Sequence, residues 1–383
     1  MTETSLFDHL QRDGAPGPLA GVKVLDLSAY IAGPYGCTLL ADQGAKVLKI
    51  EPPGGDNLRQ YPSTLDTESR AFLGVNRSKR GIVLDLKDAL QQAQLLKLVG
   101  QADVLVHNFR PSVPARLGID FERLSLLNPR LVYCAVSGYG ERGPLRDKAG
   151  YDQVLQAMTG MSALQGKRHG PPEVIYGSVV DYYAAALVAS GVSSALYERE
   201  RSGLGQFVGV SLLRAALTMQ SARLVWAEGE ALDIGRDMRS GGVTGIHPAK
   251  DGYLYLSANT PRFWKSLCSL TGLEALADDP RYATVKLRAA HAEEILPRLH
   301  DALQRHSAPE WEVIFGDAVP CAAARKVEDM FQHPQVRAED MIGEVEHPVV
   351  GRYQNVTRPI VYGRTPGPEP FAAPVLGQDN ALL

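Results

Sequence analysis

Cysteine, net charge and long apolar runs are all scarce in this sequence. Its 383 residues include only four cysteines, which lie far apart without a C-x-x-C pair: Cys37, Cys134, Cys268 and Cys321. This pattern argues against a disulfide framework and against a zinc site, so we expect no bound metal. The formal net charge of -3 gives no electrostatic reason to bind nucleic acid or an anionic membrane surface, and we expect neither as a partner.

The apolar segments of exported and membrane-spanning proteins are also missing. Residues 1–18 are polar and lack the apolar core of a signal peptide. The longest uncharged run of the central helix, 182–197, is shorter than a membrane span and rich in small polar residues. With 45% hydrophobic and 22% charged residues, a chain of this length predicts a soluble globular protein of two domains, and we expect a cytoplasmic one.

The start of the chain predicts a doubly wound α/β sheet. Residues 22–27 and 45–50 have the apolar composition of buried strands, and a helix from Gly33 to Asp42 lies between them. Glu51 then occupies the position of an acidic ribose ligand in dinucleotide-binding folds. However, the intervening turn has no G-x-G-x-x-G, and Pro34 lacks an amide that a pyrophosphate would need, so NAD binding is disfavoured.

Asp181 is the candidate nucleophile. It ends an apolar run and directly precedes a helix-like segment, 182–201, that is rich in Ala, Ser and Gly. A carboxylate at a helix start lies near the positive end of the helix dipole, which favours the ionised form that a nucleophile needs. The structural alternative is that Ser178 and Asp181 form a capping box, with Asp in place of the usual Glu.

Several strings resemble the class III CoA-transferases (CaiB/BaiF type), a family that includes the formyl-CoA and carnitine CoA-transferases and the related α-methylacyl-CoA racemases. These strings are A-G-P at 32–34, K-I-E-P-P-G-G-D at 49–56, N-F-R-P at 108–111, S-G-Y-G-x-x-G-P at 137–144, and the segment from Asp181 to Leu213. Similar segments run in the family's order from about residue 20 to 378. Their order and spacing make the resemblance specific.

The resemblance implies a large Rossmann-like domain built from both chain ends, a smaller α+β domain, and a homodimer of interlocked chains. We place the large domain at 1–224, the small domain at 225–325, and a return segment that completes the large domain at 326–383. Within the small domain we expect a strand at 253–258, a helical region over 262–306 and a helix at 311–315.

The resemblance also implies site residues. Asp181 would become acylated, and backbone amides of Ala32 and Gly33, or of a loop at Gly241 and Gly242, would stabilise the oxyanion. The residues implied at the CoA site are Arg77, Lys79, Asn108, Phe109, Arg110, Arg116 and Tyr151. The bases Arg77 and Lys79 are read either as a clamp for the CoA phosphates or as a solvated face. Phe109 is read either as an adenine platform or as core, and Asp152 either as an N-cap or as a second active-site carboxylate.

The implied function is acyl-CoA:carboxylate CoA transfer through aspartyl anhydride and aspartyl-CoA thioester intermediates, with acyl-CoA and a carboxylic acid as substrates. Succinyl-CoA is one candidate donor, whose second carboxylate would need a base such as Arg59, Arg142, Lys148 or Arg239. Ile31 replaces the Gln of formyl-CoA transferases, which disfavours formate–oxalate exchange. One alternative is an acyl-CoA racemase or epimerase, but Tyr151 occupies the position of the racemase His and is a poor base. The other is a CoA-binding homologue without turnover.

Overall fold

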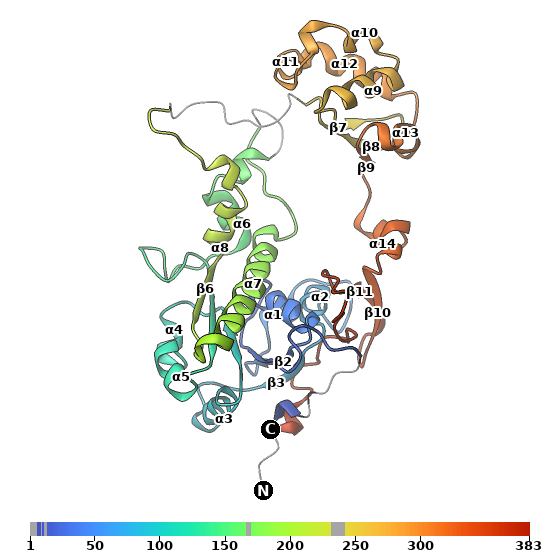
Figure 1. The fold of residues 1–383 in the computed structure, drawn as a ribbon. Helices are drawn as coiled ribbons and strands as arrows, with labels where there is room; N and C mark the ends of the chain where they lie inside the picture. The colour runs from blue at the N-terminus through green and yellow to red at the C-terminus, as the bar shows by residue number, and fades with distance from the viewer. Residues whose placement is uncertain (1–5, 9, 11–13, 166–169, 231–241) are drawn as a thin grey trace. The chain divides into compact units, whose positions relative to one another are not determined.

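The structure is a computed structural model that describes residues 6–8, 10, 14–165, 170–230 and 242–383. The chain divides into two compact units (Figure 1). The first unit combines Met1–Val225 with Pro334–Leu383, and the second is Trp226–His333. The domain boundaries inferred from the sequence stay a prediction about independently folding parts.

A parallel sheet of six strands forms the centre of the first unit. The strands are β1 (Lys23–Asp26), β2 (Lys46–Glu51), β3 (Arg80–Val83), β4 (Val104–His107), β5 (Val132–Ser137) and β6 (Phe207–Ser211). Their order, β3-β2-β1-β4-β5-β6, is that of the doubly wound Rossmann sheet. The strand order reverses between β1 and β4, and ligands of such sheets bind at the carboxyl ends of the strands at this point. The predicted α/β class is therefore confirmed.

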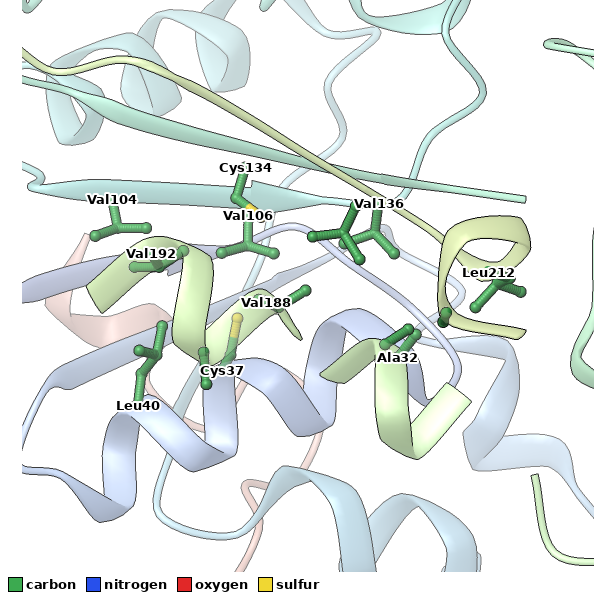
Figure 2. Close-up of a cluster of buried hydrophobic side chains, with 14 of the residues drawn as sticks. Ala32, Cys37, Leu40, Val104, Val106, Cys134, Val136, Val188, Val192 and Leu212 are labelled. Atoms are coloured by element: carbon green, nitrogen blue, oxygen red, sulfur yellow. The ribbon is translucent and has the colours of Figure 1, made fainter. Parts of the chain in front are cut away.

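Helices cover both faces of this sheet, because alternate residues of each buried strand point to opposite sides. On one face, α1 (Ala32–Asp42), α6 (Asp152–Met158), α7 (Val179–Ser202) and α8 (Leu212–Thr218) enclose one core. Figure 2 shows part of it, with Cys37 and Val188 of two helices pointing towards Val106 of β4. On the other face, α3 (Ala89–Val99) and α5 (Phe121–Leu127) enclose a second core with Leu25, Leu105 and Tyr133. The shorter helices α2 (Arg70–Asn76) and α4 (Val113–Arg116) belong to the same unit.

Helix α7 packs closely on α1 because the contact between them is built from small residues. A side chain on Gly36 would place its Cβ 2.7 Å from Cγ1 of Val188. An 18-residue window of α7 has a mean hydropathy of 1.4, so this helix of 24 residues is long and apolar enough to cross a membrane by length and composition alone, although its uncharged run, 182–197, is shorter than a span. Its buried residues, including Val180 and Val192, nevertheless lie in the core against the sheet.

The segment after residue 334 returns to the first unit. It contains α14 (Pro334–Ala338) and the antiparallel hairpin of β10 (Ile342–His347) and β11 (Gly351–Val356). Near its end, the Asp379 carboxylate accepts a hydrogen bond from the Gly81 amide of β3 at 2.7 Å. Asn380 accepts another from the Val83 amide at 2.8 Å. These side chains take up amides along the edge strand of the sheet.

The second unit is an α+β fold. Its antiparallel sheet has the order β7-β8-β9, with β7 (Gly245–Pro248), β8 (Tyr253–Leu256) and β9 (Cys321–Ala323). The helices are α9 (Pro261–Thr271), α10 (Glu274–Ala277), α11 (Val285–Ala290), α12 (Ala292–Leu303) and α13 (Ala308–Phe315). Trp264 and Trp311 are buried in its core. The second unit also contains the short 3-10 turns Pro280–Tyr282, Gly316–Ala318 and Val327–Phe331, and the first unit contains Leu6–Asp8, Asn57–Gln60, Ser162–Leu164, Ser221–Arg223 and Asn380–Leu382.

Candidate active site

Asp181 lies in the first turn of α7 and lines a cavity of about 190 Å³ in the first unit. The preceding Val180 is fully buried in the core, so the helix start is held firmly and Asp181 faces the cavity. Ser178 adopts the left-handed conformation, with φ of 59°, and its side chain makes no capping hydrogen bond. The capping box proposed for Ser178 and Asp181 is therefore not formed.

Asp152 caps α7 instead, although it belongs to α6. Its Oδ2 accepts hydrogen bonds from the amides of Val180 at 2.6 Å and Asp181 at 3.0 Å. The Gln156 side-chain amide donates to Asp152 Oδ1 and to the carbonyl of Ile175, which ties α6 to the segment before α7. Asp152 is only 1% exposed. Asp152 therefore caps a different helix from the one expected. It also lines the cavity beside Asp181, so its role as a second active-site carboxylate stays a prediction.

The electrostatic environment of Asp181 differs from the prediction. Burial, together with the nearby carboxylate of Asp152, raises the pKa of Asp181 from 3.8 to about 7. The helix dipole was expected to favour the ionised form, but Asp152 occupies the α7 amides that would have done so. Among the residues that the structure describes, none donates a hydrogen bond to the Asp181 carboxylate. A carboxylate of this basicity is about half ionised at pH 7, and its ionised form is a stronger nucleophile than that of an ordinary Asp.

The turn at Ala32 and Gly33 begins α1, and Ala32 lines the same cavity. The first hydrogen bond of the helix runs from the Tyr35 amide to the Ile31 carbonyl, at 2.8 Å, so the amides of Ala32 and Gly33 come before the bonded ladder. Only glycine fits at Gly33, since a Cβ there would lie 2.4 Å from the side chain of Ser28. The oxyanion role of these amides stays a prediction.

A second cavity, of about 430 Å³, lies at the carboxyl ends of β1 and β4, where the strand order reverses. Tyr30 and Asn108 line both cavities, so the two are adjacent. Asn108 fixes the turn between them: its Nδ2 donates to the Ala29 carbonyl at 2.7 Å, and its Oδ1 accepts from the Ala29 amide at 2.9 Å. Phe109 also lines the second cavity and stacks on His107, with ring centroids 5.4 Å apart.

The bases Arg77 and Lys79 do not form a clamp at the surface. The Lys79 ammonium is fully buried and donates hydrogen bonds to Asp26, Asn76 and the carbonyl of Pro34. Arg77 is 1% exposed, and its guanidinium pairs with Asp42 at 2.8 Å. These two residues therefore form neither an exposed phosphate clamp nor a solvated face. A short string of bases cannot reveal that the chain folds them inwards onto buried acids.

The other predicted bases are spread out. Arg110 and Arg116 are exposed and do not line either cavity. Each is next in sequence to a residue that lines the second cavity: Arg110 follows Phe109, and Arg116 precedes Leu117. Arg59 is held by Glu51 through two hydrogen bonds of 2.8 Å, which removes it as a partner for a second substrate carboxylate. The same contacts occupy Glu51, so it is not free to bind a ribose.

Tyr151 lines the same cavity as Asp181 and is half-exposed. Its ring contacts that of Tyr30 edge to face, with centroids 5.7 Å apart. Tyr30 is the main site residue that the sequence did not reveal.

Gly241 lies outside the described residues and Gly242 belongs to the second unit, so the loop expected to close over the acyl group stays a prediction. The described ranges contain no group of three or more His, Cys, Asp or Glu side chains that could hold a metal.

Comparisons with known proteins agree over nearly the whole chain. The model of CoA-transferase family III matches residues 19–380. Acetyl-CoA:oxalate CoA-transferase of Acetobacter aceti is 38% identical over 85% of this chain and 85% of its own length. Succinate–glutarate CoA-transferase of Agrobacterium fabrum is 33% identical over 96% of this chain and 94% of its own length.

Solved structures agree with this assignment. The Rv3272 protein of Mycobacterium tuberculosis has a TM-score of 0.83 at 30% identity, over 96% of this chain and 99% of that one. A CaiB/BaiF family protein of Brucella suis has a TM-score of 0.82 at 27% identity, over 96% of this chain and 98% of that one. This chain therefore belongs to CoA-transferase family III and is a CoA-transferase enzyme.

Proposed function

We propose that this enzyme moves CoA between carboxylic acids through covalent intermediates on Asp181. The observation that carries the proposal is the placement of this one basic carboxylate in a small cavity adjacent to a larger one at the strand ends. The larger cavity suits one part of CoA, its pantetheine arm or its adenine, and the smaller one, the reaction cavity of this proposal, suits the acyl group. Tyr30 and Asn108, which line both, mark where the thioester would pass.

The reaction proceeds in four balanced steps. The Asp181 carboxylate attacks the donor thioester carbonyl, and CoA leaves as a thiolate to give an aspartyl anhydride. The thiolate then attacks the Asp181 carbonyl, which releases the donor acid and forms an aspartyl-CoA thioester. The acceptor carboxylate attacks this thioester and frees CoA again, giving a second anhydride. Finally the thiolate attacks the acceptor acyl carbon and releases the new acyl-CoA and the Asp181 carboxylate.

For CoA itself, we assign Phe109 to the adenine or pantetheine and the exposed Arg110 and Arg116 to the phosphates, because each arginine neighbours a residue that lines the larger cavity. Asn108 acts on the turn through Ala29 rather than on CoA directly. The amides of Ala32 and Gly33 supply the oxyanion site, with the loop at Gly241 and Gly242 closing over the acyl group.

Dicarboxylates are the substrates that the relatives suggest, since their names include oxalate, succinate and glutarate. Succinyl-CoA is accordingly the first donor to test. We also propose a homodimer, which the family resemblance implies, and a cytoplasmic location, in keeping with the ordinary globular composition of the chain.

The test is intact-protein mass spectrometry after mixing the enzyme with succinyl-CoA, acetyl-CoA and other acyl-CoAs, followed by hydroxylamine trapping. We expect an adduct on the peptide that carries Asp181, and none in Asp181→Asn. The exposed Asp66 provides a control, since Asp66→Asn should retain the adduct. Incorporation of solvent deuterium at the acyl α-carbon, with Asp181 unmodified, would instead support the racemase alternative.

A further inference from the structure

Tyr30 forms a wall that the reaction cavity and the larger cavity share. Its backbone has a φ of 64°, a left-handed conformation that is uncommon for a bulky residue. Such a conformation is energetically unfavourable and persists only where the surroundings hold it. The strain therefore raises the question of what holds Tyr30 and what its side chain does there.

A buried ion pair holds the backbone of Tyr30. The Tyr30 amide donates to Oδ1 of Asp56 at 3.1 Å, and Oδ2 of Asp56 pairs with the Lys49 ammonium at 3.1 Å. Lys49 also donates to the carbonyl of Ser28 at 2.9 Å, so the same ion pair makes hydrogen bonds to the backbone on both sides of Ala29. Both charged side chains are at most 1% exposed, which keeps these contacts strong.

Three neighbours fix the side chain of Tyr30. The rings of Tyr61 and Tyr151 meet it edge to face, with centroids at 6.3 and 5.7 Å. The Asn57 side-chain amide donates to its hydroxyl at 3.2 Å. Edge-to-face aromatic contacts have a preferred geometry, so the ring is held as a fixed partition. Tyr61 and Tyr151 line the reaction cavity as well.

We propose that Tyr30 determines substrate specificity by limiting the acyl group at Asp181 to short chains. The inference rests on the proposed function, because it assumes that the acyl group occupies the cavity beside Asp181. That cavity measures about 190 Å³. A cavity of about 150 Å³ accommodates benzene, so this one has room for about six to eight non-hydrogen atoms. A longer chain would need the space that the Tyr30 ring fills.

The test compares the binding of two unreactive CoA thioethers, S-butyl-CoA and S-dodecyl-CoA, to the wild-type enzyme and to Tyr30→Gly by titration calorimetry. Glycine adopts the Tyr30 backbone conformation without strain, so the variant should fold. We expect the wild type to bind S-butyl-CoA at least about tenfold more tightly than S-dodecyl-CoA. In Tyr30→Gly that ratio should fall to about threefold or less. Tyr30→Asn, a second residue type that tolerates this conformation, should repeat the result if Tyr30→Gly does not fold.

Two controls separate volume from other effects. Tyr30→Phe keeps the ring and should keep the wild-type ratio, whereas Tyr197→Ala removes an exposed tyrosine of α7 outside both cavities and should leave it unchanged. The inference is overturned if the wild type does not discriminate between the thioethers, or if Tyr30→Gly and Tyr30→Asn discriminate as the wild type does. Because the thioethers need no chemistry, this failure is distinct from the absence of an Asp181 adduct. If neither thioether binds to any of the proteins, the CoA site itself is wrongly placed and the inference falls with it.

Discussion

Asp152 and Asp181 carry the same side chain but differ in what surrounds it. Asp152 accepts two amide hydrogen bonds at the start of α7, while burial and the charge of Asp152 raise the pKa of Asp181. The Asp152 carboxylate is thereby hydrogen-bonded, whereas the Asp181 carboxylate faces the cavity with a raised pKa. The sequence indicated the position of Asp181 but not the cap, because the capping residue lies 28 positions before Val180. Local spacing rules, which proposed Ser178, cannot find a partner so remote.

The first prediction concerns the pH dependence of acylation. Because only the ionised form of Asp181 attacks the thioester, the rate of adduct formation should rise with pH and level off above about 7. Rapid-quench mass spectrometry from pH 5.5 to 8.5 measures it. A rate that is flat across this range, or that falls, would contradict the role of Asp181 as a nucleophile with a raised pKa.

A second prediction concerns stability. Since the folded-state pKa of Asp181 lies above its ordinary value of 3.8, ionisation penalises the folded state, and this penalty grows as the pH rises from about 4 to about 7. Asp181→Asn removes the penalty. After allowance for partial exposure, the variant should exceed the wild type by roughly 1–2 kcal/mol in free energy of unfolding at pH 8 and match it near pH 4. Denaturant titrations at both pH values test this, and an equal difference at both would refute it.

The third prediction separates the two effects of Asp152. Asp152→Asn weakens the α7 cap, which should lower the free energy of unfolding by about 1 kcal/mol. It also removes the charge that disfavours ionised Asp181, so the pH midpoint of acylation should move to lower pH. Asp88 caps α3 through the amides of Leu90 and Gln91 and provides a matched control. Asp88→Asn should lower stability similarly and leave the midpoint in place.

At the scale of the elements, hydrophobic pattern predicted the buried strands well. The expected strands at 22–27 and 45–50 correspond to β1 and β2, with ends within one residue. The chain passes from β6 directly into α8, with no loop between the two elements. The change comes at Ser211, whose hydroxyl accepts from the Arg214 amide at 3.2 Å and caps α8. A strand that passes directly into a helix gives no loop composition to mark the boundary.

The fourth prediction tests the structural role of Lys79, which joins β1, α1 and α2 through Asp26, Pro34 and Asn76. Lys79→Met leaves the Asp26 carboxylate buried without its partner. We expect the free energy of unfolding to fall by about 3–5 kcal/mol, whereas Lys97→Met, at an exposed position of α3, should change it little. If Lys79→Met kept its stability and lost only CoA affinity, the phosphate-clamp reading would be restored.

At the scale of the whole molecule, the family resemblance implied a large domain built from both chain ends, and the first unit combines residues from both ends. What the sequence could not show is how distant residues meet inside it. Arg77 pairs with Asp42, and Lys49 with Asp56 beneath Tyr30. These buried pairs depend on the packing of separate elements. The sequence alone therefore suggested surface roles for Arg77 and Lys79. The strain at Tyr30 has no signature in sequence for the same reason.

The fifth prediction concerns the return segment. Asp379→Ala deprives the Gly81 amide of its acceptor on β3. Hydrogen exchange at Gly81 should become faster, while amides in the core strands of the second unit, such as Leu254, should exchange as in the wild type. Exchange followed by mass spectrometry on β3 peptides provides the measurement. Unchanged protection at Gly81 would mean that the edge of the sheet does not depend on this contact.

This contact has a consequence for synthesis in the cell. The ribosome makes β3 early and makes Asp379 and Asn380 only after the entire second unit. Until then the outer strand of the nascent sheet exposes amides that can pair with other chains, during the period when a growing polypeptide is most prone to aggregate. Because Asp379 and Asn380 are synthesised last, the β3 amides stay unpaired for most of synthesis, and a chaperone that covers this strand would reduce aggregation.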